Sequence, residues 1–180
     1  LTSSTTFIID QDFTCLAPIP FLPAGWSLLS CQEGVSGQGP VLALKVSDPS
    51  GKKMAILALR FPDAYHDLYT SEEDYVGAWS SSTFSLADQN GDGADEVWLR
   101  IVLTGTGHYL YVEVVDLRPD GSDYVGGVNS LSHGTFTFVE GGAVVTSTAD
   151  SVTPAPTVTN HITWSGVSWQ IDDAFALAGS

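Results

Sequence analysis

Residues 96–117, EVWLRIVLTGTGHYLYVEVVDL, contain two runs of β-branched, aliphatic and aromatic residues on either side of a glycine-rich segment. Such runs are typical of strands, and the glycines between them are typical of a hairpin turn. Similar short runs, separated by glycine, proline, serine and aspartate, fill much of the 180-residue chain, and no long stretch has apolar residues at helical spacing. The sequence therefore predicts an all-β protein, an antiparallel β-sandwich or meander.

Further strands are predicted on both sides of this hairpin. Residues 41–47 and 54–61 flank DPSGKK, whose proline and glycine suit a turn, and residues 161–172 contain two short strands around Ser-Gly. The segment SEED at 71–74 resembles a helix start that soon meets a glycine, so we expect at most one short helix. Residues 1–14 are β-prone without an adjacent hairpin partner and are expected to form an extended arm.

The two cysteines, Cys15 and Cys31, bound a proline-rich apolar stretch and lack the spacing of a metal or catalytic motif. A disulfide is the simplest pairing, and two buried free thiols are the alternative. A bond closing this loop would stabilise the fold by about 3 kcal/mol in an oxidising compartment. We predict an N-terminal arm and disulfide-stapled loop over residues 1–35 and a calcium-binding β domain over residues 36–180, in a single folding unit.

The charge balance excludes some classes of partner. Six basic residues against 21 acidic ones give a formal net charge of −15, which repels nucleic acid phosphates and anionic membrane surfaces. No apolar run approaches the roughly 20 residues of a membrane-spanning helix. We therefore expect neither nucleic acid binding nor membrane insertion. Solubility or a salty medium also accounts for high acidity, so only clustered carboxylates carry chemical information.

One such cluster is DQNGDGADE, residues 88–96. Calcium takes six to eight oxygen ligands, so a short segment that binds it must curl and direct alternate residues inward. Glycines permit the curl. Counted from the start of this acidic loop, candidate ligands occupy the first, third, fifth, seventh and ninth positions: the side chains of Asp88, Asn90, Asp92 and Glu96, and the backbone carbonyl of Ala94.

The pattern DxNGDGxxE, followed by the strand-like residues 97–102, resembles the EF-hand-like calcium loops of FG-GAP and VCBS-type β-propeller repeats in bacterial extracellular proteins, and more distantly dockerin repeats. This resemblance covers nine residues and implies a Ca²⁺ ion held by Asp88, Asn90, Asp92, Ala94 and Glu96. It does not extend to the propeller fold, because the loop occurs once. Magnesium fits less well, since it requires tighter octahedral geometry.

A polar turn without an ion is the alternative for this loop, although four carboxylates within nine residues repel one another unless a cation is present. A second group, Asp116, Asp120 and Asp123, surrounds Pro-Asp-Gly and is better explained as a turn.

Motifs of an active site are absent from the sequence. The four histidines lie in separate segments without zinc-ligand spacing, and neither a nucleophile elbow nor a phosphate-binding loop occurs. The protein is therefore predicted not to be an enzyme. Trp164 and Trp169 flank a tight turn, and their separation of five places them on opposite faces of a continuous strand, which argues against a sugar-stacking platform.

We expect a secreted, calcium-binding structural protein that assembles with copies of itself into an extracellular fibre or matrix. Such joining can use a β-prone arm that completes the sheet of the next subunit. We expect an extracellular location, either secreted or cell-surface associated, from the cysteine pair and from a chain that starts at Leu1, as expected after processing. The alternative is a calcium-dependent, lectin-like module that binds glycans through some of its five tryptophans and six tyrosines.

Overall fold

The computed structural model describes residues 14–16, 22, 24–36, 39–51, 54–60, 65–70, 82–103, 109–116, 124–129, 132–148 and 154–172. Every regular element within these ranges is a β-strand. The strands, in chain order, are β1 (Ser27–Ser36), β2 (Gly39–Ser47), β3 (Met54–Arg60), β4 (Tyr65–Thr70), β5 (Thr83–Ala87), β6 (Glu96–Leu103), β7 (Tyr109–Asp116), β8 (Tyr124–Asn129), β9 (Ser132–Val139), β10 (Gly142–Thr148), β11 (Thr157–Trp164) and β12 (Trp169–Asp172).

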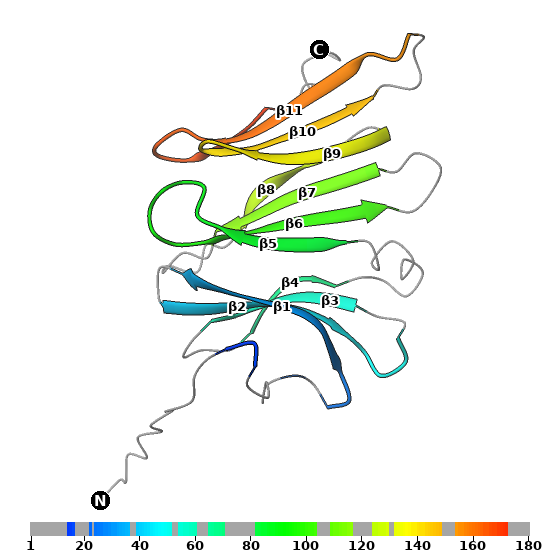
Figure 1. The fold of residues 1–180 in the computed structure, drawn as a ribbon, viewed down its shortest axis with the longest axis vertical. Coiled ribbons are helices and arrows are strands. Elements are labelled where there is room, and N and C mark those ends of the chain that lie inside the picture. Colours follow the sequence, from blue (N-terminus) through cyan, green and yellow to red (C-terminus); the bar gives the residue numbers. More distant parts are fainter. Residues whose placement is uncertain are drawn as a thin grey trace, which may run out of the picture.

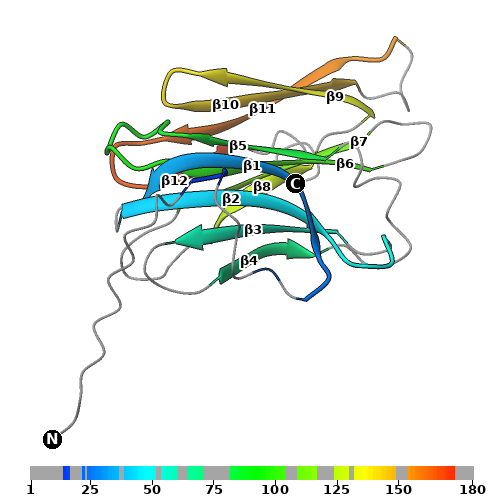
Figure 2. The same ribbon diagram turned by 60° about the horizontal axis from the view of Figure 1, so that its bottom comes forward.

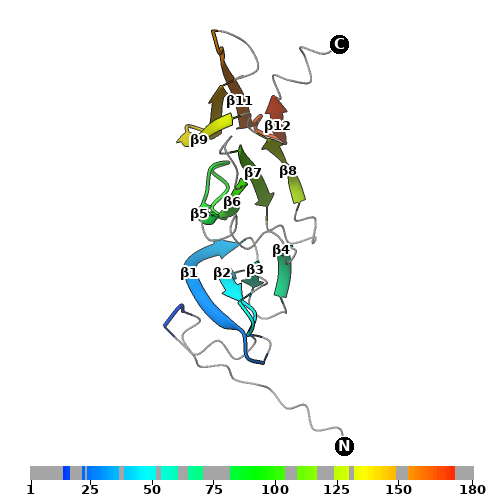
Figure 3. The same cartoon turned by 90° about the vertical axis from the view of Figure 1, so that its right-hand side faces the viewer.

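The strands form three sheets that lie one on another (Figure 1 and Figure 2). The first sheet contains β1–β4, the middle sheet β5–β8 and the third sheet β9–β12, and each is a four-stranded antiparallel meander in chain order. Figure 3 shows β1, β5 and β9 along one side of the stack and β4, β8 and β12 along the other. The all-β prediction is confirmed as a sandwich-like arrangement of three sheets. Residues 1–13 of the predicted arm and the predicted helix at 71–74 lie outside the described residues.

The strand sequences reflect how many faces each sheet buries. Strand β2 is buried at every position from Val41 to Ser47, and a strand buried on both faces reads as a continuous apolar run. In β9, Thr135 and Thr137 are exposed whereas Phe136 and Phe138 are partly buried. This alternation is typical of a strand with one face in water.

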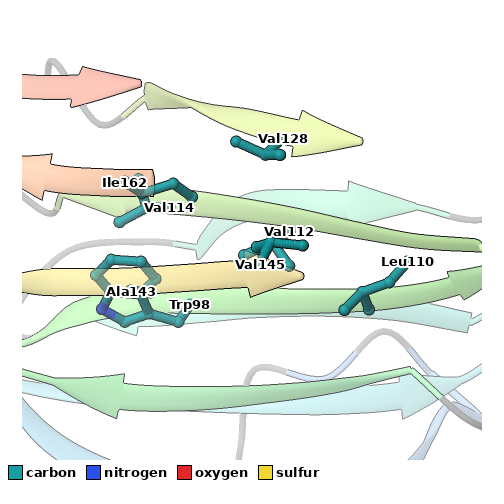
Figure 4. Packing of buried hydrophobic residues seen from close by; sticks show 8 residues of the cluster. All are labelled: Trp98, Leu110, Val112, Val114, Val128, Ala143, Val145 and Ile162. Atoms are coloured by element: carbon teal, nitrogen blue, oxygen red, sulfur yellow. The ribbon is translucent and has the colours of Figure 1, made fainter. Parts of the chain in front are cut away.

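The middle sheet is covered on both faces. Val97 and Leu99 of β6 pack with Val41 and Ala43 of the first sheet. Trp98, which points the other way from the same strand, packs against the third sheet. The residues of this second cluster are drawn in Figure 4: Trp98, Leu110, Val112, Val114, Val128, Ala143, Val145 and Ile162.

The two ends of the stack differ. The outward face of the first sheet, Leu42, Leu44 and Val46, packs against Cys15, Leu22 and Trp26 of the N-terminal segment and against Cys31 of β1. Cys15 and Cys31 form a disulfide with their Cα atoms 5.7 Å apart, which confirms the predicted pairing. The outward face of the third sheet instead carries a hydroxyl-rich surface, which we call the threonine face: Thr135, Thr137, Thr146, Thr148, Thr157, Thr159 and Thr163.

Two sequence predictions about the first half of the chain have different outcomes. The hairpin of β2 and β3 is confirmed, and Gly51 donates its N–H to the carbonyl of Asp48 in the turn (3.1 Å). The apolar stretch between the cysteines was expected to be a loop throughout, but residues 27–31 belong to β1. No proline follows Pro23 in this stretch, so residues 27–31 can pair with β2. The predicted boundary at residue 35, between the N-terminal arm and loop and the β domain, stays a prediction.

Candidate metal centre

The acidic loop connects the first two strands of the middle sheet. Asp88 follows the last residue of β5, and Glu96 is the first residue of β6. The loop bends through Gly91 and Gly93, whose φ angles of 75° and 87° are readily adopted by glycine. The Asp88 carboxylate accepts the N–H of Gly91 through Oδ1 (2.7 Å) and the N–H of Gly93 through Oδ2 (3.0 Å). These bonds fix the curl that the sequence predicts.

Three of the five predicted ligands converge in this loop. One carboxylate oxygen from each of Asp88, Asp92 and Glu96 lies within 4.8 Å of the others. Asp88 and Asp92 are exposed, whereas Glu96 is buried at 1% exposure. The acidic triad can therefore hold a metal ion between solvent and the sheet interior.

The other two predicted ligands shape the same loop. Asn90 accepts the backbone N–H of Asp92 through Oδ1 (2.9 Å) and donates its side-chain amide to Asp92 Oδ2 (3.0 Å). The N–H of Ala94 donates to Asp92 Oδ1 (2.8 Å). Asn90 is thus beside the triad, and its amide oxygen keeps a lone pair for a cation. Ligation by Asn90 and by the carbonyl of Ala94 stays a prediction.

Burial makes Glu96 the most perturbed acid of the loop. Desolvation raises the pKa of its carboxyl from 4.5 to about 8, and the negative charges of Asp116, Asp88 and Asp92 add to the increase. The hydrogen bond from the N–H of Gln89 to Glu96 Oε2 (2.9 Å) opposes it. A cation beside Glu96 would stabilise the ionised carboxylate that this environment disfavours.

The sequence places Asp116 in a second group with Asp120 and Asp123, apart from the acidic loop, but the structure places it beside Glu96. The register of β6 and β7 pairs Asp116 with Glu96, and Asp116 is buried at 5% exposure. The other two members of the predicted second group, Asp120 and Asp123, lie outside the described residues. A sequence signal existed, because a hairpin centred on Thr106 places residue 96 opposite residue 116. The structure therefore brings a further carboxylate close to the acidic triad.

The donor set fits a hard divalent cation. All the candidate side-chain ligands present oxygen, which calcium and magnesium prefer. In the part of the chain that the structure describes, no lysine or arginine forms an ion pair with Asp88, Asp92 or Glu96. Within the described part of the chain no basic side chain therefore compensates their negative charge, and buried carboxylates are normally paired or bound to a metal.

The structure corrects the sequence argument about two tryptophans. Trp164 and Trp169 are cross-strand partners in the β11–β12 hairpin, and their ring centroids lie 5.5 Å apart. They therefore share a face, because the intervening turn reverses the chain and the two residues do not lie on one continuous strand. Trp169 also contacts Trp98 edge to face, with centroids 5.4 Å apart. Both hairpin tryptophans are partly exposed.

Comparisons with known proteins give no family for this chain: it matches no protein-family model, no curated protein and no solved structure. The described residues contain no helix of the length and apolarity needed to cross a membrane.

Proposed function

We propose that this chain is an extracellular, calcium-binding structural protein. The observation that carries the proposal is the convergence of Asp88 and Asp92 on Glu96, a carboxylate that is almost fully buried and has no basic partner among the residues that the structure describes. A divalent ion at this position removes the repulsion among the three carboxylates and compensates the burial of one of them.

Calcium is preferred to magnesium on the character of the loop. The proposed ligands come from one short segment and combine side chains with a backbone carbonyl. Calcium tolerates such irregular geometry at longer bond lengths. Magnesium retains its water molecules and needs a near-octahedral arrangement. The exposed Asp88 and Asp92 leave room for water ligands on the solvent side.

Isothermal titration calorimetry with Ca²⁺ and Mg²⁺, on protein treated with a chelator, tests ion binding. We expect one saturable calcium site with weaker magnesium binding, and at least a tenfold loss of calcium affinity in Glu96→Gln. Asp172→Asn is the matched control, because it removes an exposed acid from β12, outside the loop. Absence of calcium binding at millimolar concentration would contradict the proposal.

The stability of Glu96→Gln without calcium gives a second, independent signature. Because Glu96 is buried among other acids, its replacement by a neutral isostere should raise the free energy of unfolding in chelator while removing the stabilisation by calcium. A variant that is merely misfolded would be destabilised in both conditions. Chemical denaturation with and without calcium distinguishes these outcomes.

Assembly into an extracellular fibre or matrix is the second part of the proposal. It is supported by the disulfide, which is typical of oxidising compartments, and by β9, a strand at the edge of its sheet. Such an edge can accept an extended segment of another copy through main-chain hydrogen bonds. We propose that residues 1–9 supply this segment. Deleting them should abolish large particles in calcium-containing buffer, and an unchanged particle mass would exclude this mode of assembly.

Glycan binding is a second candidate function, favoured by the tryptophan pair of the β11–β12 hairpin. The backbone N–H of Trp164 donates to the carbonyl of Gly141 (2.8 Å), so the tryptophan pair lies beside the β9–β10 turn. A partly exposed indole can stack on a sugar ring. Glycan-array binding that requires calcium and is lost in Trp164→Ala would support this function, whereas binding unaffected by both changes would exclude this site.

A further inference from the structure

The acidic loop is joined to the first sheet by a residue that is not a predicted ligand. Asp95 donates its N–H to the carbonyl of Val35 in β1 (2.6 Å) and accepts the N–H of Val35 through Oδ2 (2.8 Å). The approach is close at Gly34, where an added Cβ would lie 2.6 Å from Asp95 Oδ2 and 2.8 Å from Leu86 Cδ1. Asp95 thus pairs with β1 as a neighbouring strand would.

The opposite side of the loop is joined to the third sheet. In the side-chain orientation that satisfies both of its amide atoms, Gln89 donates to the carbonyl oxygens of Val139 (2.9 Å) and Gly142 (3.2 Å) in the β9–β10 hairpin. The backbone N–H of the same residue donates to Glu96 Oε2 (2.9 Å). Gln89 therefore contacts both the third sheet and the buried carboxylate of the acidic triad.

We propose that Asp95 and Gln89 are positioning residues of the ion site, so that ion binding in the loop and docking of the first and third sheets on the middle sheet stabilise each other. This inference rests on the proposed calcium binding. A second observation supports it besides the cluster of acids: the buried Glu96 carboxylate points into the cluster. Among the described residues it accepts one hydrogen bond, from Gln89, which also bonds the third sheet.

The physical reason is the position of both residues in the chain. Asp95 lies between Ala94 and Glu96, so any shift of Glu96 toward an ion moves the backbone that pairs with Val35. Gln89 lies between Asp88 and Asn90, so a shift of either residue toward an ion moves the side chain that bonds the third sheet. An ion that fixes the loop conformation reduces the entropy lost when the inter-sheet hydrogen bonds form. By thermodynamic linkage, removing those hydrogen bonds must lower the ion affinity by the same factor by which the ion stabilises the hydrogen-bonded state.

Hydrogen exchange at the backbone amide of Val35, measured with calcium and with chelator, tests the contact with the first sheet. We expect calcium to slow exchange of this amide at least tenfold in the wild-type protein. In Asp95→Ala, which removes the acceptor, the calcium effect on Val35 should disappear and calcium affinity should fall by the same factor, about tenfold.

Asp95→Asn separates position from charge. Asparagine keeps an oxygen that can accept the N–H of Val35 but removes the negative charge near the ion. We expect this variant to retain the calcium-dependent protection of Val35 and most of the affinity. If Asp95→Asn instead loses as much affinity as Asp95→Ala, the residue acts through charge and the positioning role is overturned.

Gln89→Ala tests the contact with the third sheet, with Gln170→Ala as the control, because Gln170 is an exposed glutamine of β12 whose side chain bonds only Ser168 among the described residues. We expect Gln89→Ala to weaken calcium binding severalfold and the control to leave it unchanged. Calcium binding without any change at Val35 would overturn this inference alone, whereas absence of calcium binding in every protein would overturn the proposed function.

Discussion

The two faces of the middle sheet are held by different chemistry. Toward the first sheet, the contact consists of aliphatic side chains with Phe84, and polar groups of Gln32 and Asp95 bridge the sheets beside it. Toward the third sheet, Trp98 contacts Phe136 and Phe138 at ring-centroid distances of 6.1 and 5.3 Å. One interface thus combines small apolar contacts with the directed hydrogen bonds of Gln32 and Asp95. The other buries large rings, and the Gln89 side chain bonds the β9–β10 hairpin beside them.

This difference indicates which interface depends on an ordered loop. Aromatic rings bury large areas and stabilise a contact without an exact backbone position. Hydrogen bonds between sheets, in contrast, are lost when either partner moves by about an ångström. The first sheet should therefore loosen before the third when the acidic loop is perturbed.

The largest expected effect comes from truncating neighbouring residues of β6 that face opposite ways. Trp98→Ala should lower the free energy of unfolding by about 4 kcal/mol and Leu99→Ala by about 3 kcal/mol, because both side chains are fully buried and the indole leaves the larger cavity. Urea denaturation measures both values. Equal losses, or a larger loss in Leu99→Ala, would show that the aromatic contact with the third sheet stabilises the fold no more than the aliphatic contact with the first.

Removing the disulfide tests the outer side of the first sheet. The double variant Cys15→Ser, Cys31→Ser should lose about 3 kcal/mol, because the bond restricts the unfolded chain. The loss should be accompanied by faster hydrogen exchange in β2, whose Leu42 and Leu44 pack against the cysteines, with little change in β10. Uniform acceleration across all three sheets would show that the stack unfolds as one unit.

Each interface also contains a buried glutamate, which allows a comparison by pH. Glu96 and Glu113 both have pKa values raised by burial, and strand alternation places Glu113 on the face of Val115, toward the first sheet. A raised pKa means that the folded state holds the proton more tightly, so this contribution to stability is present below pH 4.5 and is lost as pH rises toward about 8 in the case of Glu96.

Thermal denaturation in chelator between pH 5 and 8 should therefore show stability falling with increasing pH. Saturating calcium should remove the Glu96 part of this slope, because the ion replaces the proton, and leave the Glu113 part. Glu96→Gln should abolish the effect of calcium on the slope, and Glu113→Gln should preserve it. A slope that is the same with and without calcium would contradict ion binding at Glu96.

The smallest effect is expected for Gln32. Its side chain accepts the N–H of Leu86 (3.0 Å) and donates to the carbonyl of Phe84 (3.3 Å), thereby pairing with the edge of β5. Gln32→Ala should cost about 1–2 kcal/mol, as expected for lost hydrogen bonds at a partly buried site. Equilibrium unfolding beside Gln170→Ala measures the difference, and a variant as stable as this control would show that the bridge contributes nothing.

Sequence patterns were sufficient for most of the strands and for the curl of the acidic loop, because both are local; the start of β1 and the whole of β4 were not predicted as strands. Alternation and turn residues identified the hairpins, and the spacing of Asp88, Asp92 and Glu96 placed their oxygens together. The roles of Gln32, Gln89 and Asp95 could not be predicted, because each side chain bonds a sheet other than the one to which its own segment belongs. No local sequence pattern indicates such a long-range partner. The pairing of Trp164 with Trp169 was missed since the turn between them reverses the strand direction.

The threonine face has a consequence for how far this architecture can extend. The hydroxyls of Thr135 and Thr146 are hydrogen-bonded to each other, so a fourth sheet laid on this face would have to cover polar groups with little apolar area gained in return. The opposite end already has its apolar cover. Stacking of a further sheet on the threonine face is therefore unfavourable, and the proposed assembly would extend sideways, in the plane of a sheet.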